Sequence, residues 1–166
     1  IMTARVGLFP TDYPEEDDRR RFFEELHRRL QERSGVVAAS LTQQLPVKFT
    51  GNSRFSVEGA SYAEEAERPR ANTTAVSPGY FETFGLDMLQ GRDFTVMDNA
   101  DAQRVVIVNR SFAEKFYPDR SALGQRFSGG QLGTPEVEEW WTIVGVAPDL
   151  YMNGPLNEEP EGFYRP

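Results

Sequence analysis

The sequence predicts an α+β fold, with strands and helices mixed along the chain (mixed α/β). Three observations predict it. Segments patterned like strands alternate along the chain with segments of helical periodicity. Residues 104–109 and 140–149 are strongly apolar runs, typical of strands that are buried on both faces. The chain has 166 residues, of which 39% are hydrophobic and 12% aromatic, so it can build a sizeable core.

The N-terminal part of the chain predicts a strand, a helix and a second strand. Residues 3–9 alternate between apolar and other side chains, as in a half-buried strand. An apolar stripe at helical spacing predicts a helix over residues 14–33. The stripe consists of Phe22, Phe23, Leu26 and Leu30. Residues 36–43 predict the next strand, so we expect a β-α-β unit with its two strands in parallel.

The charges of the predicted helix suit it. Glu24 and Arg28, and likewise Glu25 and Arg29, stand four residues apart with the acid first, the favourable order for a helical ion pair. The arginines near its end match the negative end of the helix dipole.

The next part of the chain predicts two strands separated by a polar segment. After a loop over residues 44–52, residues 54–59 show strand alternation. Residues 61–69 are mostly polar and charged, and residues 70–76 predict another strand.

A short helix and a bent extended segment follow. Ser77 is a favoured N-cap residue, Pro78 suits the first helical position, and Gly85 suits the left-handed conformation that ends many helices. Residues 86–94 are expected to run extended, with a bend at Gly91. We therefore interpret this stretch as architecture and assign it no catalytic role.

The last third of the chain predicts one more helix between strands. Asn109 is expected to cap a helix over residues 110–117, and Pro118 ends it. Residues 121–127 lead into a strand, and residues 161–166 can add a short final strand.

The composition excludes several classes of function. The net charge of −8 would repel a phosphate backbone, so we expect no nucleic-acid binding. Because the chain has no cysteine, it can form neither disulfides nor cysteine-ligated zinc sites. No apolar run reaches the length of a membrane helix, and the start at Ile1-Met2 suggests a piece of a longer protein.

No pattern in the chain predicts a catalytic, cofactor or metal site. His27 is the only histidine, so it has no second histidine with which to ligand zinc, and we expect a structural role. The acidic residues occur as adjacent pairs that point apart, which is typical of solvated faces. These pairs are Glu15-Glu16, Asp17-Asp18, Glu64-Glu65, Glu138-Glu139 and Glu158-Glu159.

Three further patterns have plain structural interpretations. The glycines of residues 129–133 lack the lysine of a phosphate-binding loop, so we expect a hairpin turn. Asn72 and Asn109 match the glycosylation pattern, which often arises by chance. Trp140 and Trp141 are adjacent in a strand, so one is expected in the core and one at the surface.

Several motifs, in this order, resemble the MacB-like periplasmic core domain of ABC-type permeases, over essentially the whole chain. The most specific are Ser77-Pro-Gly-Tyr-Phe81, Gly91-Arg-Asp-Phe94, Val106-Ile-Val-Asn109, Leu123-Gly124 and Ile143-Val-Gly-Val146. Arg92 and Asp93 are expected to be paired or buried charges.

The resemblance implies an extracytoplasmic domain without catalytic activity or cofactor, at the face of the bacterial inner membrane. Residues 1–43 would be the first half of a ferredoxin-like porter subdomain, and residues 44–166 an inserted mixed α/β subdomain. The implied partners are the transmembrane helices of the parent permease, a cytoplasmic ATPase, and a homologous permease domain or periplasmic protein.

Two alternatives remain open at this point. The first is a small hydrolase that uses two distant carboxylates, which requires a deep pocket with acids about 5–10 Å apart. The second is an extracytoplasmic sensor domain that binds a ligand without transport.

Overall fold

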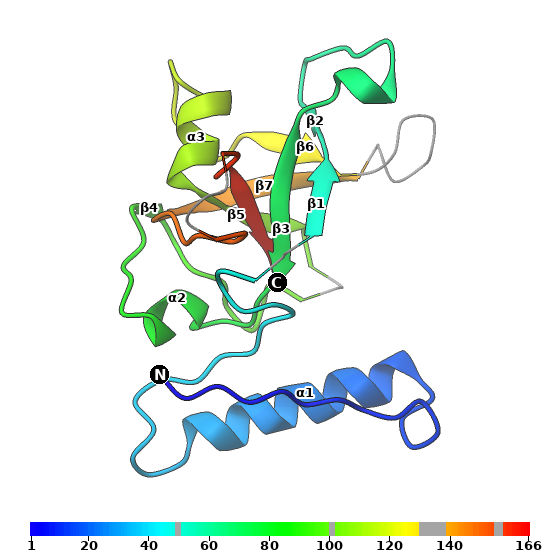
Figure 1. The fold of residues 1–166 in the computed structure, drawn as a ribbon, viewed down its shortest axis with the longest axis vertical. Coiled ribbons are helices and arrows are strands. Elements are labelled where there is room, and N and C mark those ends of the chain that lie inside the picture. Colours follow the sequence, from blue (N-terminus) through cyan, green and yellow to red (C-terminus); the bar gives the residue numbers. More distant parts are fainter. Residues whose placement is uncertain (49–50, 100–101, 130–138, 155–157) are drawn as a thin grey trace.

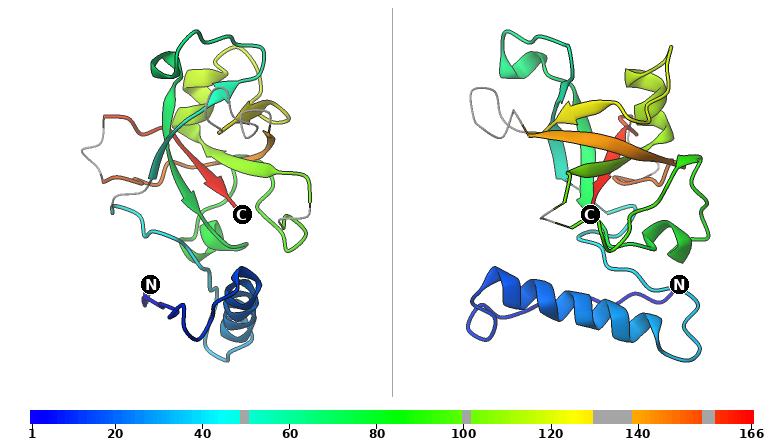
Figure 2. Two further views of the ribbon diagram at one scale, coloured as in Figure 1. Left: turned by 90° about the vertical axis from the view of Figure 1, so that its right-hand side faces the viewer. Right: turned by 180° about the vertical axis from the view of Figure 1, so that it is seen from behind.

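A curved, mixed sheet carries most of the structure (Figures 1 and 2). The computed structural model describes residues 1–48, 51–99, 102–129, 139–154 and 158–166. In these residues the strands are β1 (Gly51–Arg54), β2 (Ser56–Val57), β3 (Arg70–Ala75), β4 (Gln90–Gly91), β5 (Val105–Asn109), β6 (Arg126–Ser128), β7 (Trp140–Ala147) and β8 (Gly162–Arg165). The helices are α1 (Glu16–Gln31), α2 (Tyr80–Thr83) and α3 (Arg110–Phe116), with a 3₁₀ turn at Glu65–Glu67. The predicted mixed fold is confirmed.

The sheet curls until its two ends meet at Phe55. Its strand order is β1-β3-β8-β5-β7-β6-β2, and β4 pairs with β7 beside this path. β1 and β2 stand at opposite ends of the order, yet only Phe55 separates them in the chain. The single strand predicted over residues 54–59 is therefore two short strands on the two ends of the sheet. The two end strands are each paired on one side only, with β3 and with β6, and Phe55 joins them through the chain.

The strand at the centre of the sheet is buried on both faces, as its sequence predicts. All five residues of β5 are buried. Val106 and Val108 belong to one core cluster and Ile107 to the other. Its neighbour β7 is irregular, because Val106 pairs with Ile143 whereas Ile107 pairs with Gly145. This bulge places Ile143 and Val146 in the same cluster although they are three residues apart.

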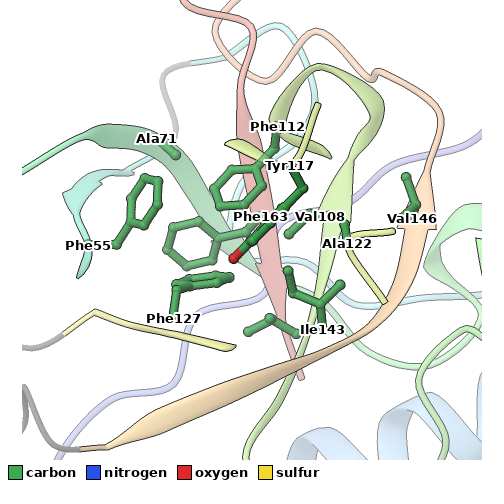
Figure 3. Packing of buried hydrophobic residues seen from close by; sticks show 11 residues of the cluster. Phe55, Ala71, Val108, Phe112, Tyr117, Ala122, Phe127, Ile143, Val146 and Phe163 are labelled. Carbon is green, nitrogen blue, oxygen red and sulfur yellow. The ribbon is translucent and has the colours of Figure 1, made fainter. Parts of the chain in front are cut away.

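The first core cluster is a group of packed aromatic rings inside the curved sheet (Figure 3). The ring of Phe55 lies 5.0 Å from Phe112 and 5.3 Å from Phe127, measured between centroids. Phe163 lies 5.1 Å from Phe127 and joins β8 to the same group. These four side chains are at most 1% exposed, so α3 and the closing strands share one dry interior.

The second core cluster explains the aromatic residues of the short helix α2. Tyr80 and Phe81 are 2% and 1% exposed, and their rings pack against Tyr164 of β8 at 5.9 and 4.9 Å. Gly85 follows the helix with φ of 67°, as expected for a helix C-terminus. Ser77 is not the N-cap residue, however, because Gly79 occupies that position with φ of 79°.

Two buried asparagines fasten residues 159–162 to the sheet. The side-chain amide of Asn72 donates to two backbone carbonyls of this segment, at 2.7 and 3.1 Å. The amide of Asn109 donates to a third, at 2.7 Å, while its Oδ1 accepts from the Phe112 amide and caps α3 as predicted. Both asparagines of the glycosylation pattern are thus buried and hydrogen-bonded in the fold.

The helix predicted near the N-terminus is present, but the two strands predicted around it are not. Residues 3–9 and 36–41 have no strand partner in the described part of the chain. Residues 42 and 43 instead meet the extension of β3, through a bridge from Thr42 to Val76. A strand needs a neighbour for its backbone hydrogen bonds, and alternation alone does not supply one.

Helix α1 lies below the sheet, beside the N-terminal segment (Figure 1), and none of its residues is buried. The predicted pair of Glu25 and Arg29 is present, with 2.6 Å between Oε1 and Nε. The predicted pair of Glu24 and Arg28 is not, because Arg28 binds Glu25 and Glu32, both at 2.7 Å. Arg28 therefore forms ion pairs with two carboxylates on the solvent-exposed face of the helix.

Candidate functional site

The only histidine supports the linker that follows α1. His27 is half-buried, and its Nε2 lies 2.9 Å from the carbonyl oxygen of Ala39. Because a carbonyl oxygen can only accept, Nε2 carries the proton and donates it to this bond. The imidazole thereby ties the helix to its own linker.

Several of the acidic residues form ion pairs with arginines. Asp17 binds Arg20 at 3.0 Å and Asp18 binds Arg21 at 2.9 Å on α1. Other such pairs join Glu65 to Arg68, Glu139 to Arg104, and Glu58 to Arg126. The last guanidinium holds the pKa of the Glu58 carboxyl below its ordinary value. A lowered pKa is the opposite of what a general acid requires.

An open hollow at the start of α1 does not supply the pocket of a hydrolase. Its lining is Glu15, Glu16, Asp17, Asp18 and Arg21, all from the first turns of one exposed helix. Such a surface is open to solvent and encloses no substrate. In the described residues no group of three histidine or acidic side chains is placed to hold a metal ion.

Arg92 and Asp98 form a two-bond ion pair that shapes the turn after β4. The Arg92 guanidinium donates to the two Asp98 carboxylate oxygens at 2.7 and 2.8 Å. Asp98 also accepts from the Thr95 amide at 2.7 Å. These bonds lower the pKa of Asp98, Arg92 being the largest cause. The expected pairing of Arg92 is confirmed, with Asp98 as its partner.

Asp93 connects the same turn to the start of α2. It is half-buried, and its Oδ1 accepts from the Phe94 amide at 2.7 Å. The backbone of Gly79 lies near the same carboxylate and acts to lower its pKa. Burial raises the pKa of Asp93, and the nearby carboxylates of Glu82 and Asp98 add to this rise. The expected burial of this charge is confirmed in part.

Ser77 joins the sheet to the linker that follows α1. Its hydroxyl accepts from the Leu41 amide at 2.8 Å, and its own amide donates to the Leu41 carbonyl at 2.9 Å. The next contact along, from the Gln43 amide to the Ala75 carbonyl, is 3.0 Å long. No local pattern signals this role, since the two residues of the pair are 36 positions apart.

The expected split of the tryptophan pair into one core and one surface residue is met only in part, because both are half-buried. Trp141 packs against the first core cluster, with its ring 5.7 Å from Phe163. Trp140 lies under the Arg126 guanidinium at 5.9 Å. The glycine-rich turn predicted next to them lies, from residue 130 onward, outside the described residues.

Large apolar side chains remain exposed in the segments around α1 and in several loops. Those more than two-thirds exposed are Ile1, Met2, Phe9, Val37, Val96 and Met97. Tyr151 is 58% exposed, whereas Phe163 is buried in the core. In the described part of the chain, no helix is long and apolar enough to cross a bilayer.

Solved structures with a similar fold come from transporter proteins. One is the periplasmic region of MacB from Actinobacillus actinomycetemcomitans, at 18% identity and a TM-score of 0.55, with 86% of this chain and 54% of that chain covered. A second is a permease protein domain from Porphyromonas gingivalis, at 18% identity and a TM-score of 0.54, with 84% and 54% covered.

A third is the extracellular domain of the ABC-type transporter YknZ from Gram-positive bacteria, at 22% identity and a TM-score of 0.49, with 86% and 61% covered. The chain thus spans about half of the length of the first two structures, 54% of each. Among curated proteins, none matches this sequence.

The family comparison covers almost the whole chain. The model of the MacB-like periplasmic core domain matches residues 8–164, which include α1, the sheet and both buried asparagines. This chain therefore belongs to the MacB-like periplasmic core domain family.

Proposed function

We propose that this chain is a non-catalytic extracytoplasmic domain of an ABC-type permease at the periplasmic face of the bacterial inner membrane. The observation that carries the proposal is the family match over residues 8–164. The fold likeness to the MacB periplasmic region supports the same assignment. The arginine-paired carboxylates favour this function over the hydrolase alternative.

The domain would relay motion from the membrane to a cargo or a partner protein. A cytoplasmic ATPase would move the transmembrane helices of the parent permease, and these would move this domain against a homologous domain or a periplasmic partner. The closed sheet suits such a task, because its aromatic interior makes it a stiff body that can move as a unit.

We further propose that residues 1–43 are the first half of a porter-like subdomain and that residues 44–166 are the inserted one. The apolar stripe of α1 is only half-buried, and residues 3–9 lack a strand partner. Both features fit a unit that is completed by strands outside residues 1–43.

The test replaces residues 44–160 by a short flexible linker in the full-length permease. Vesicles loaded with an amphipathic fluorescent dye report transport, and phosphate release reports ATP hydrolysis. We expect transport to be lost while basal hydrolysis persists. The substitution Glu24→Ala serves as control, since Glu24 is exposed on α1, and should leave both activities intact. Transport that survives the replacement would overturn the proposal.

A further inference from the structure

The position of α1 relative to the sheet depends on few contacts. None of the residues of α1 is buried, and α1 makes no extensive contact with any strand of the described residues. The helix is followed by a linker over residues 32–40, which it holds through the bond from His27 to Ala39. The linker reaches the sheet at residues 41–43, so these residues transmit any force between the two parts.

On the sheet side, the linker binds to the turn at Ser77, Pro78 and Gly79. Ser77 exchanges two hydrogen bonds with Leu41, at 2.8 and 2.9 Å. Thr42 bridges to Val76 directly beside them. The turn thus holds the linker by the backbone on one side and by a hydroxyl on the other.

The same turn also lies beside the end of α1 and the loop after β4. A Cβ on Gly79 would lie 3.9 Å from the Ala39 carbonyl and 4.0 Å from the Gln31 side-chain amide, so the glycine faces α1 and its linker. The backbone of Gly79 also lies near Asp93, where it acts to lower the pKa of that carboxyl. A positive φ of 79° at Gly79 makes this turn tight, and side chains rarely adopt it.

We propose that Ser77, Pro78 and Gly79 form a joint that sets the position of α1 against the sheet, with Ser77 as the positioning residue. A neutral hydrogen bond between a hydroxyl and an amide is weak enough to break and re-form during motion. The purpose of the joint rests on the proposed function, since a domain that relays motion needs a defined connection between its parts. The geometry of the joint stands independently of it.

The experiment measures the distance between α1 and the sheet unit. Residues 1–166 contain no cysteine, so Glu24→Cys on α1 and Asp119→Cys after α3 provide two spin-label sites in this chain. Both positions are exposed. The full-length permease in nanodiscs, with any cysteine elsewhere replaced, carries the labels, and pulsed electron paramagnetic resonance gives the distance distribution.

Ser77→Ala is expected to broaden the distribution of distances between the two spin labels. Ser77→Thr, which keeps the hydroxyl, is expected to give the narrow distribution of the unchanged chain. Hydrogen exchange of the Leu41 amide should become roughly fivefold faster in Ser77→Ala, the effect of losing one net hydrogen bond. The matched control is Ser121→Ala, which removes a similar bond, from the Leu123 amide at 3.2 Å, away from the joint. It should leave both readouts unchanged.

A second variant acts from the linker side. Leu41→Pro removes the amide that donates to Ser77 and leaves the sheet residues untouched. It should broaden the distribution as Ser77→Ala does, with the sheet's thermal unfolding midpoint retained. An unchanged distribution in both variants would overturn the joint. A broadened distribution together with transport that survives replacement of residues 44–160 would retain the joint and overturn the proposed function.

Discussion

Gly91 lies so close to the backbone carbonyl of Val144 that a side chain at position 91 would collide with it. A Cβ on Gly91 would lie 2.2 Å from the Val144 carbonyl oxygen and 2.7 Å from the Leu123 side chain. The opposing Gly145 is equally tight, since its Cβ would lie 2.4 Å from the Arg92 carbonyl. Two of the motifs that resemble the family therefore meet at one backbone contact, where β4 pairs with β7.

The substitution Gly91→Ala is expected to destabilise the fold by about 2–4 kcal/mol, because it adds a backbone clash to the strain of a positive φ. The φ of Gly91 is 71°. Urea unfolding of the purified chain measures this loss.

Gly124→Ala is the matched control for this clash. Gly124 has a similar φ of 77°, but a Cβ there would meet no atom within 4 Å. Gly124→Ala should lower the free energy of unfolding only by the cost of placing alanine at a positive φ, about 1–2 kcal/mol. Equal losses in the two variants would show that the contact with Val144 is looser than the structure has it.

Phe55 closes the sheet, so its removal should be among the most damaging single changes. Phe55→Ala would leave a cavity among Phe112, Phe127 and Phe163 and is expected to destabilise by about 3–5 kcal/mol. Phe9→Ala is the control, because Phe9 is 72% exposed and should change stability by no more than about 0.5 kcal/mol. Thermal unfolding of both variants measures these changes in stability. A small loss of stability for Phe55→Ala would contradict a closed interior.

Local patterns predicted most elements of the sheet and the helices but not their connections. Asn109 stands next to the helix that it caps, so the signal lies within a few residues. The partner of Ser77 is 36 positions away, and a favoured N-cap residue carries no information about such a partner. The closure at Phe55 depends in the same way on strands far apart in the chain.

The strands predicted over residues 3–9 and 36–43 failed for a related reason. Alternation records which face of a strand would be buried, whereas strand formation also needs a neighbour. The ion pairs of α1 show the same limit on a smaller scale, since spacing suggested Glu24 for Arg28 and the structure gives it Glu25 and Glu32. Arg92 is predicted to be a paired or buried charge, but nothing in the sequence points to Asp98, six residues on, as its partner.

The pair of Arg92 and Asp98 should make stability depend on pH in the acid range. The lowered pKa of Asp98 means that the unfolded chain binds the proton more tightly. The contribution is therefore full above the ordinary pKa of aspartate and is lost as the pH falls through the lowered value. Asp98→Asn should lose about 1 kcal/mol at pH 7, since Arg92 is partly exposed.

Urea unfolding at pH 7 and at pH 3 tests this dependence. The difference between Asp98→Asn and the unchanged chain should shrink at pH 3, where the carboxylate of the unchanged chain is being protonated. A difference of constant size across this range would mean that the negative charge of Asp98 does not contribute to stability.

Asp93 should show the opposite dependence, although it lies only five residues before Asp98. Its pKa is raised, chiefly by burial, so the folded chain binds the proton more tightly than the unfolded one. Its effect favours folding at low pH, and stability is lost as the pH rises from the ordinary aspartate pKa through the raised value.

Asp93→Asn keeps an oxygen that can accept from the Phe94 amide and removes the charge. We expect this variant to equal or exceed the unchanged chain in stability at pH 7 and to lose that advantage at pH 4, as measured by urea unfolding. If Asp93→Asn is instead less stable at pH 7 and recovers in acid, as expected for Asp98→Asn, the carboxylate of Asp93 is stabilised and not penalised by its place beside Gly79.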